Sequence, residues 1–190
     1  MKKAGKIIGI IAIAVVALAG YFIKTYNSIV TIEQNVDTQY SNIKVQLQRR
    51  ADLIPNLVDT VKGYVAHEEK VIQDITSARE KMTNAGNIKE LSEANEQLTA
   101  ALNSLNVVIE NYPDLKANQN FISLQDELSG TENRIATARR DYNEVVREYN
   151  TKISRFPTSI VAGIAGKDKK DLFDVTDSSK EDVPTVKFSE

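Results

Sequence analysis

The chain has 190 residues, with 24 Lys and Arg against 26 Asp and Glu, a single His and no Cys. The balanced charge leaves no strong uniform field to attract nucleic acid, and the absence of Cys excludes disulfides, thiolate metal ligands and cysteine nucleophiles. Because so few side chains of catalytic or ligating type are present, we expect one domain of ordinary size with no enzymatic activity and no cofactor.

The N-terminus predicts a membrane anchor. After a short basic stretch at residues 1–6, residues 7–23 carry no charge, and this is about the minimum length of a helix that spans a bilayer. A cleaved signal peptide is the alternative, because Ala17-Leu18-Ala19 has the small-x-small form that signal peptidase accepts. Apolar side chains continue beyond that point from Tyr21 to Ile23, and an aromatic pair there suits a membrane interface, so the anchor is favoured.

The basic residues around this segment predict its orientation. Lys2, Lys3 and Lys6 precede it, whereas Lys24 alone follows it closely. The positive-inside bias therefore predicts a cytoplasmic N-terminus and a domain that faces away from the cytoplasm.

Residues 24–157 predict a helical bundle domain. Its first helix continues from the anchor, since neither Gly nor Pro occurs between Phe22 and Ile54. The apolar positions of this helix are spaced by three and four residues, with Glu33 as an exception. They are Ile29, Val36, Tyr40, Ile43, Leu47 and Ile54.

The segment around Pro55 predicts a break in the helix. Pro is tolerated in the first turn of a helix but not in its interior, and Asp52 is a good N-cap three residues earlier. We therefore expect one helix to end near Arg50 and another to begin near Leu53 after a tight reversal. A kinked continuous helix is the alternative.

Two further helices follow. The second is expected from Leu53 to Met82, where Asn84-Ala85-Gly86-Asn87 is a strong loop signal. The third runs from about Lys89 to Ile109 and ends before Tyr112-Pro113, because Pro disfavours helix in the preceding residue.

The fourth helix, from Phe121 to Phe156, has the clearest heptad pattern. Its period slips only at Lys152, where Ile153 takes over one place later. The expected buried residues are Phe121, Leu124, Leu128, Thr131, Ile135, Ala138, Tyr142, Val145, Tyr149 and Phe156. Four amphipathic helices with short connections predict an all-α fold, an elongated antiparallel four-helix bundle after the transmembrane helix.

Residues 158–190 predict a flexible C-terminal tail, since they mix charges with Ser and Thr without a sustained period. Phe156-Pro157 is expected near the anchor if the fourth helix returns toward the membrane. Ile160, Val161 and Ile164 are candidates for contact with the base of the bundle or with lipid headgroups.

A polar band flanks the fourth helix's apolar stripe. If Tyr142 occupies heptad position a, then Gln125, Glu132 and Arg139 all occupy position e. Such a band usually fixes the register between helices, and a ligand site is the alternative. The residues that we single out as an interaction or structural polar motif are Arg49, Arg50, Asp52, Pro55, Asn56, Glu132, Arg139 and Asn143.

Two residue types remain. His67 has no second His at i+4 and too few ligating neighbours, so a packing or surface histidine is favoured over a metal site. Asn is a mediocre helix former, so some members of an Asn-rich set are expected to cap or bridge helices. The set is Asn118, Asn120, Asn133, Asn143 and Asn150.

Two blocks of sequence closely resemble the LemA family. The first contains Val45 to Val58, with Gln-Arg-Arg-Ala-Asp-Leu-Ile-Pro-Asn-Leu at its centre, and then Val61 to Tyr64 and His67-Glu68. The second runs from Tyr112-Pro113-Asp114 through Thr131 to Ile135 and on to Phe156-Pro157, with a weaker echo at Leu172-Phe173 and Val183 to Phe188. Tyr40, where Trp is expected, and a tail poor in aromatic residues depart from the family pattern.

The resemblance implies a single-pass bacterial inner-membrane protein with a helical bundle and no established enzymatic activity. Some related proteins are associated with shaping internal membranes. We therefore expect a scaffold or adaptor for membrane or envelope proteins, which can also form homo-oligomers and does not bind nucleic acid. A ligand-sensing module that uses the polar band is the alternative function.

Overall fold

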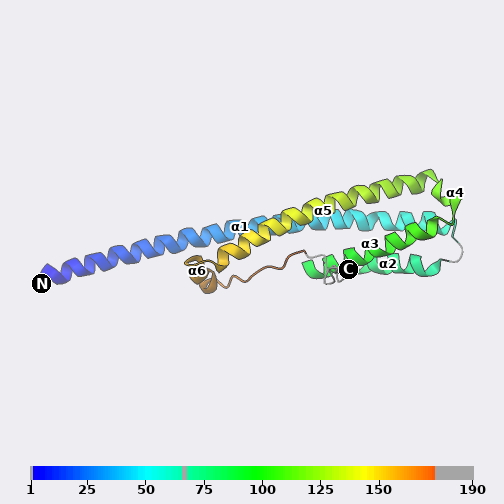
Figure 1. Ribbon diagram of the computed structural model, residues 1–190. Coiled ribbons are helices and arrows are strands. Elements are labelled where there is room, and N and C mark those ends of the chain that lie inside the picture. Colours follow the sequence, from blue (N-terminus) through cyan, green and yellow to red (C-terminus); the bar gives the residue numbers. More distant parts are fainter. Residues whose placement is uncertain (1, 66–67, 174–190) are drawn as a thin grey trace, which may run out of the picture. The chain divides into compact units, whose positions relative to one another are not determined.

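The computed structural model describes residues 2–65 and 68–173, and no strand occurs in these two stretches. The all-helical prediction is confirmed (Figure 1). The helices are α1 (Lys2–Lys62), α2 (Glu69–Asn84), α3 (Ile88–Ile109), α4 (Pro113–Lys116), α5 (Gln119–Ser154) and α6 (Thr158–Ile164). The described residues divide into two compact units, unit 1 with residues 2–49 and 129–172 and unit 2 with residues 50–65, 68–128 and 173.

In unit 1, α1 changes from an exposed apolar helix to a packed one. It is the helix within the described stretches that is long and apolar enough to cross a membrane, and its residues 9–20 are all exposed. From Ile29 onward one stripe is buried, as the spacing of apolar residues predicts, and Glu33 interrupts it. The buried members of this stripe are Ile29, Ile32, Val36, Ile43 and Leu47.

The unit 1 part of α5 packs against this stripe. The Tyr40 and Tyr142 rings lie 6.4 Å apart, and Lys152 Nζ donates to Ser28 Oγ at 2.5 Å. Because the later α5 residue pairs with the earlier α1 residue, the two helices run in opposite directions in unit 1. The α5 residues buried in this unit are Thr131, Ile135, Tyr142, Val146, Tyr149 and Ile153.

The predicted α5 seam is wrong at its C-terminal end. Val146 is fully buried in place of the expected Val145, and Phe156 is 81% exposed beyond the end of the helix. A straight α-helix has 3.6 residues per turn, so a strict heptad drifts around its surface over several turns. The buried stripe therefore passes to Val146 and Ile153.

Residues 158–172 are held more closely than the predicted flexible tail. Val161 and Ala162 of α6 are buried, and Asn150 exchanges two hydrogen bonds with the backbone of Lys170 (2.8 and 2.9 Å). The Tyr142 hydroxyl donates to the carbonyl oxygen of Asp171 at 2.8 Å. These bonds satisfy backbone groups that an irregular segment leaves open, which sequence periodicity does not reveal. Residues 174–190 of the predicted tail lie outside the described residues.

Unit 2 is built on a helical hairpin, in which α2 packs against α3 (Figure 1). The connection is short because Asn87 caps α3, with its Oδ1 accepting from Glu90 N at 2.9 Å. The Glu90 carboxylate in turn accepts from Gly86 N at 2.7 Å, which forms a reciprocal capping arrangement. The remainder of α1, from Arg50 to Lys62, buries Ala51, Ile54, Leu57 and Val61 in this unit.

The predicted reversal near Arg50 is wrong, and the continuous-helix alternative is correct. Pro55 lies inside α1. Because Pro has no backbone N–H, the carbonyl of Ala51 loses the hydrogen bond that residue 55 normally donates. Arg79 of α2 replaces this donor, since its Nε donates to Ala51 O at 3.0 Å. The helix therefore continues through Pro55 and ends at Lys62.

Candidate functional site

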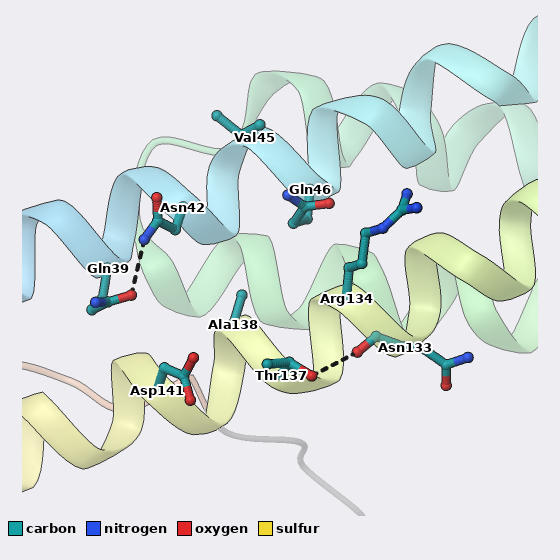
Figure 2. A pocket seen from close by; sticks show the side chains of 9 residues that line it. All are labelled: Gln39, Asn42, Val45, Gln46, Asn133, Arg134, Thr137, Ala138 and Asp141. Carbon is teal, nitrogen blue, oxygen red and sulfur yellow. Dashed lines mark hydrogen bonds between the residues drawn. The ribbon is translucent and has the colours of Figure 1, made fainter.

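One candidate polar site lies in unit 1. It is a pocket of about 440 Å³ between α1 and α5, shown in Figure 2. Its lining from α1 consists of Gln39, Asn42, Val45 and Gln46, and its lining from α5 consists of Asn133, Arg134, Thr137, Ala138 and Asp141.

Helical periodicity explains why these polar groups meet. Gln39, Asn42 and Gln46 follow spacings of three and four, which place them along one face of α1. The residues Asn133, Thr137 and Asp141 do the same on α5. Ala138 lies between the helices, and its small side chain leaves space that a larger seam residue fills elsewhere.

The lining offers both hydrogen-bond donors and acceptors. Asn42 Nδ2 donates to Gln39 Oε1 at 3.0 Å, and Thr137 Oγ1 donates to Asn133 O at 3.1 Å. Gln46 Oε1 is buried and accepts no hydrogen bond from any described residue. Arg134 and Asp141 add opposite charges at i and i+7. The pocket can therefore bind a small polar molecule, but it holds no nucleophile paired with a base.

A second polar site lies inside unit 2. Arg50 is 3% exposed, and its Nη1 donates to Asn95 Oδ1 at 2.7 Å and to Thr99 Oγ1 at 3.0 Å. Hydrogen bonds of this kind compensate for the desolvation of a buried guanidinium. This site fixes α3 to the second half of α1.

Sequence reasoning singled out Arg50 but missed its partners. Ser92, Asn95 and Thr99 repeat at i, i+3 and i+7, in step with the apolar residues of α3. Polar residues that share the period of a buried face are a signal for a buried polar contact, and this signal was available from the sequence.

The other predicted motif residues are dispersed. Arg49, Asp52, Pro55 and Asn56 are exposed, and Asn56 borders a small pocket of about 330 Å³ in unit 2. In unit 1, Glu132, Arg139 and Asn143 are half-buried on α5, and none of them lines the larger pocket. Their role as one interaction motif stays a prediction.

Two members of the Asn-rich set cap or bridge elements, as predicted. Asn118 Oδ1 accepts from Phe121 N at 3.1 Å at the start of α5, and its Nδ2 donates to the Tyr64 hydroxyl at 2.8 Å. Asn150 bridges α5 to Lys170. Gln125 of the polar band donates to Asn106 at 2.8 Å, a bond between α5 and α3 in unit 2.

An ionic cluster in unit 1 explains the exception in the α1 stripe. Glu33 accepts a hydrogen bond from Lys167 at 2.5 Å and lies 3.6 Å from Lys170 Nζ, which also lies 3.7 Å from Asp37. The hydrogen bond to Glu33 raises the pKa of Lys167, and burial raises the pKa of the neighbouring Tyr149. Glu33 therefore holds the chain that follows α6.

His67 lies outside the described residues. In the described part of the chain, no group of three or more His, Cys, Asp or Glu side chains is arranged to hold a metal ion.

A family model described as the LemA family matches residues 39–188. The magnetosome protein MamQ 2 of Paramagnetospirillum magneticum is 27% identical over 187 residues, covering 85% of this chain and 69% of the relative. The MamQ protein of Magnetospirillum gryphiswaldense is 25% identical, covering 86% and 71%. Protein LemA of Metamycoplasma hominis is 29% identical over 150 residues, covering 78% and 66%.

Proposed function

We propose, from the premise that this chain belongs to the LemA family, that it is a single-pass membrane protein whose helices form a scaffold for other proteins. The partners are other membrane or envelope proteins and further copies of the chain. We further propose that the long helices pack as an elongated antiparallel four-helix bundle.

The observation that carries this proposal is the continuity of α1. Its residues 9–20 expose apolar side chains to the surroundings, and the same helix then buries Ile29, Ile32 and Val36 in unit 1. Neither Gly nor Pro separates the two parts, since Gly20 is the last glycine before Ile29. A lipid environment would cover the exposed part at no cost in unsatisfied backbone groups, because the interior residues of an α-helix satisfy their backbone groups within the helix.

The buried polar site in unit 2 supports a structural role. Arg50 donates hydrogen bonds to Asn95 and Thr99, and these bonds stabilise unit 2 rather than hold a substrate. The relatives named magnetosome proteins are, by name, parts of a cellular structure, which agrees with an assembly role.

We propose that the N-terminus is cytoplasmic and that the helical domain lies outside the inner membrane. A single-cysteine chain tests this, because the natural chain has no Cys. Val107→Cys places a thiol at a position that is 72% exposed. We expect a membrane-impermeant maleimide to label it once the outer barrier is opened. Labelling only after the inner membrane is broken would reverse this topology.

The scaffold role is tested by crosslinking in the membrane. Photo-crosslinkers at the exposed positions Val45 and Val107 should capture envelope proteins or a second copy of the chain. A crosslinker at the buried Leu98 is the matched control and should capture neither. A chain that yields no neighbour, forms no oligomer and leaves liposome shape unchanged would rule out the scaffold.

The polar pocket supports a second candidate, a ligand-sensing module. The buried, unbonded Gln46 Oε1 is the specific observation in its favour, since a ligand with an N–H or O–H donor would satisfy it. A ligand that raises the melting temperature should lose this effect in Gln46→Leu and keep it in Val107→Ala. The polar band of Glu132 and Arg139 adjoins the pocket in sequence, so Arg139→Ala tests whether the band contributes. No shift across a broad panel of polar metabolites would count against this candidate.

A further inference from the structure

The segment from Phe156 to Gly166 carries no charged side chain and lies between two basic residues. Residues 156–166 contain no Asp, Glu, Lys or Arg, whereas Arg155 precedes them and Lys167 follows. The segment contains α6, a helix with the composition Thr-Ser-Ile-Val-Ala-Gly-Ile. A helix that is apolar on all sides is normally covered on all sides.

Protein covers only one side of this segment. Val161 and Ala162 are buried, but Phe156, Ile160 and Ile164 are 81%, 56% and 70% exposed. These three residues are spaced by four, which places Ile160 and Ile164 on one helical face with Phe156 in the turn before them. Single exposed apolar residues are ordinary, but three large ones gathered together indicate a contact surface.

The register of unit 1 places this surface at the end of the anchor. Lys152 of α5 bonds to Ser28 of α1, and the two helices run in opposite directions. Ser154, the last residue of α5, follows Lys152 by two residues, about 3 Å at the helical rise, so α5 ends level with Tyr26 and Phe156 lies in the turn that follows. Lys24 directly follows the uncharged segment 7–23. Figure 1 shows α6 at the end of α5 that lies toward the projecting N-terminal part of α1.

The chain returns from this level immediately after α6. Lys167 pairs with Glu33, which lies nine residues beyond Lys24 along α1. The segment between Lys152 and Lys167 therefore descends toward the anchor and rises again. Its apolar part is too short to cross a bilayer, which takes about 20 residues.

We propose that Phe156, Ile160 and Ile164 form a second membrane contact, in which α6 lies in the headgroup region of the same leaflet that the anchor leaves. This inference rests on the proposed membrane anchor. We expect lipid rather than protein to cover this surface, because α6 lies near the level along the α1 axis at which the anchor ends. The flanking Arg155 and Lys167 and the exposed Lys169 suit anionic headgroups.

Depth-dependent quenching in vesicles tests the contact. Single-cysteine chains Ile160→Cys and Ile164→Cys carry an environment-sensitive fluorophore and are reconstituted full-length into phosphatidylcholine–phosphatidylglycerol vesicles. Both positions are exposed, so the label does not disturb the core. Nitroxides attached near the headgroup should remove more than about half of the emission, while nitroxides deep in the acyl chains should remove less.

Two further labels separate this inference from the proposed anchor. Ile13→Cys lies in the exposed apolar part of α1 and should be quenched by the deep nitroxide. Val45→Cys is exposed on α1 far from the anchor and should not be quenched. Quenching at Ile13 with none at Ile160 and Ile164 would overturn the α6 contact and leave the anchor standing. No quenching at Ile13 would overturn both.

Two remaining outcomes also count against the contact. A blue-shifted emission at Ile160 without any nitroxide quenching would show that protein covers α6. Quenching at Ile160 by the deep nitroxide as strongly as at Ile13 would show that the segment inserts into the hydrocarbon rather than lying at its surface.

Discussion

At the level of single residues, Pro55 and Arg79 show how a helix passes a residue that normally ends it. Pro55 leaves the Ala51 carbonyl without its usual donor, and Arg79 Nε supplies one from α2. A side chain of α2 therefore provides a hydrogen bond that the backbone of α1 normally provides for itself. Its energetic effect can be isolated because each partner can be changed separately.

Arg79→Met should destabilise the chain by about 1 to 3 kcal/mol, since it leaves the Ala51 carbonyl without a bond while keeping the length of the side chain. In the Pro55→Ala background the same substitution should cost less, because an alanine at this position restores the backbone donor. Urea unfolding of the detergent-solubilised chain measures both effects. Lys70→Met on the exposed side of α2 is the control. Equal costs in the two backgrounds would refute the compensation.

Tyr142 contributes through both its ring and its hydroxyl. It is 3% exposed, and its hydroxyl donates to Asp171 O at 2.8 Å. Tyr142→Ala should therefore cost about 3 to 5 kcal/mol through loss of a buried aromatic, and Tyr142→Phe about 1 kcal/mol through loss of the hydrogen bond. A cost below about 1 kcal/mol for the alanine variant in denaturant melts would contradict the buried position.

The same hydroxyl predicts a loss of stability at high pH. Burial, with Asp171 nearby, raises the pKa of Tyr142 from 10.0 to about 12. Since the folded chain holds this proton more tightly than the unfolded chain, the contribution is complete below pH 10 and is lost as the pH rises toward 12. The free energy of unfolding should decrease more between pH 9 and pH 11 for the natural chain than for Tyr142→Phe. An equal decrease in the two chains would argue against a role of the Tyr142 hydroxyl in this loss of stability.

At the level of elements, the sequence predicts helices better than their connections. The spacing of apolar residues located α3 and α5 closely, because a helix that buries one face must repeat its apolar residues with the helical period. The same reasoning misplaced the break at Pro55, since the compensating donor is 24 residues away in the sequence. The hydrogen bonds that hold Lys170 and Asp171 were missed because they bind backbone groups, which carry no sequence signal.

Of the two candidate sites, the sequence pointed to one residue of the buried site in unit 2 and gave no indication of the pocket in unit 1. Arg50 was singled out because Arg49 and Arg50 lie beside Asp52 in the sequence, and its burial was not predicted. The pocket depends on the small side chain of Ala138 and on the way in which α1 and α5 face each other. Such facing is a property of tertiary packing, and a one-helix pattern does not contain it.

The attachment of residues 165–172 depends on Glu33. Glu33→Gln removes the charge that holds Lys167 and Lys170, whose side chains are about one fifth to one third exposed. We expect a local loss of about 1 to 2 kcal/mol, seen as faster hydrogen exchange in residues 167–171. Asp37→Asn should have a smaller effect, because Asp37 is more exposed and its contact is longer. If hydrogen exchange in residues 167–171 is unchanged in Glu33→Gln, Glu33 does not hold this segment.

At the level of the whole molecule, the basic N-terminus should decide which side of the membrane the domain occupies. Replacing Lys2, Lys3 and Lys6 by Gln removes the charge difference across the anchor. The Val107→Cys chain should then be labelled from both sides in a mixed population. Replacing Lys62, Lys81 and Lys89 instead, which are far from the anchor in the sequence, should leave the labelling unchanged. A uniform orientation in the first variant would show that another feature sets the topology.

The shortness of the apolar segment bears on how upright α1 stands. Residues 7–23 span about 26 Å at the helical rise, slightly less than a hydrocarbon core of about 30 Å, so tilting would bury polar flanks rather than relieve a mismatch. Arg49, the last α1 residue in unit 1, lies about 38 Å along the axis from Lys24. Each change of about 10° in the angle of the proposed anchor would swing that point sideways by about 7 Å, so α1 would act as a lever that turns a small tilt of the anchor into a larger displacement of its far end.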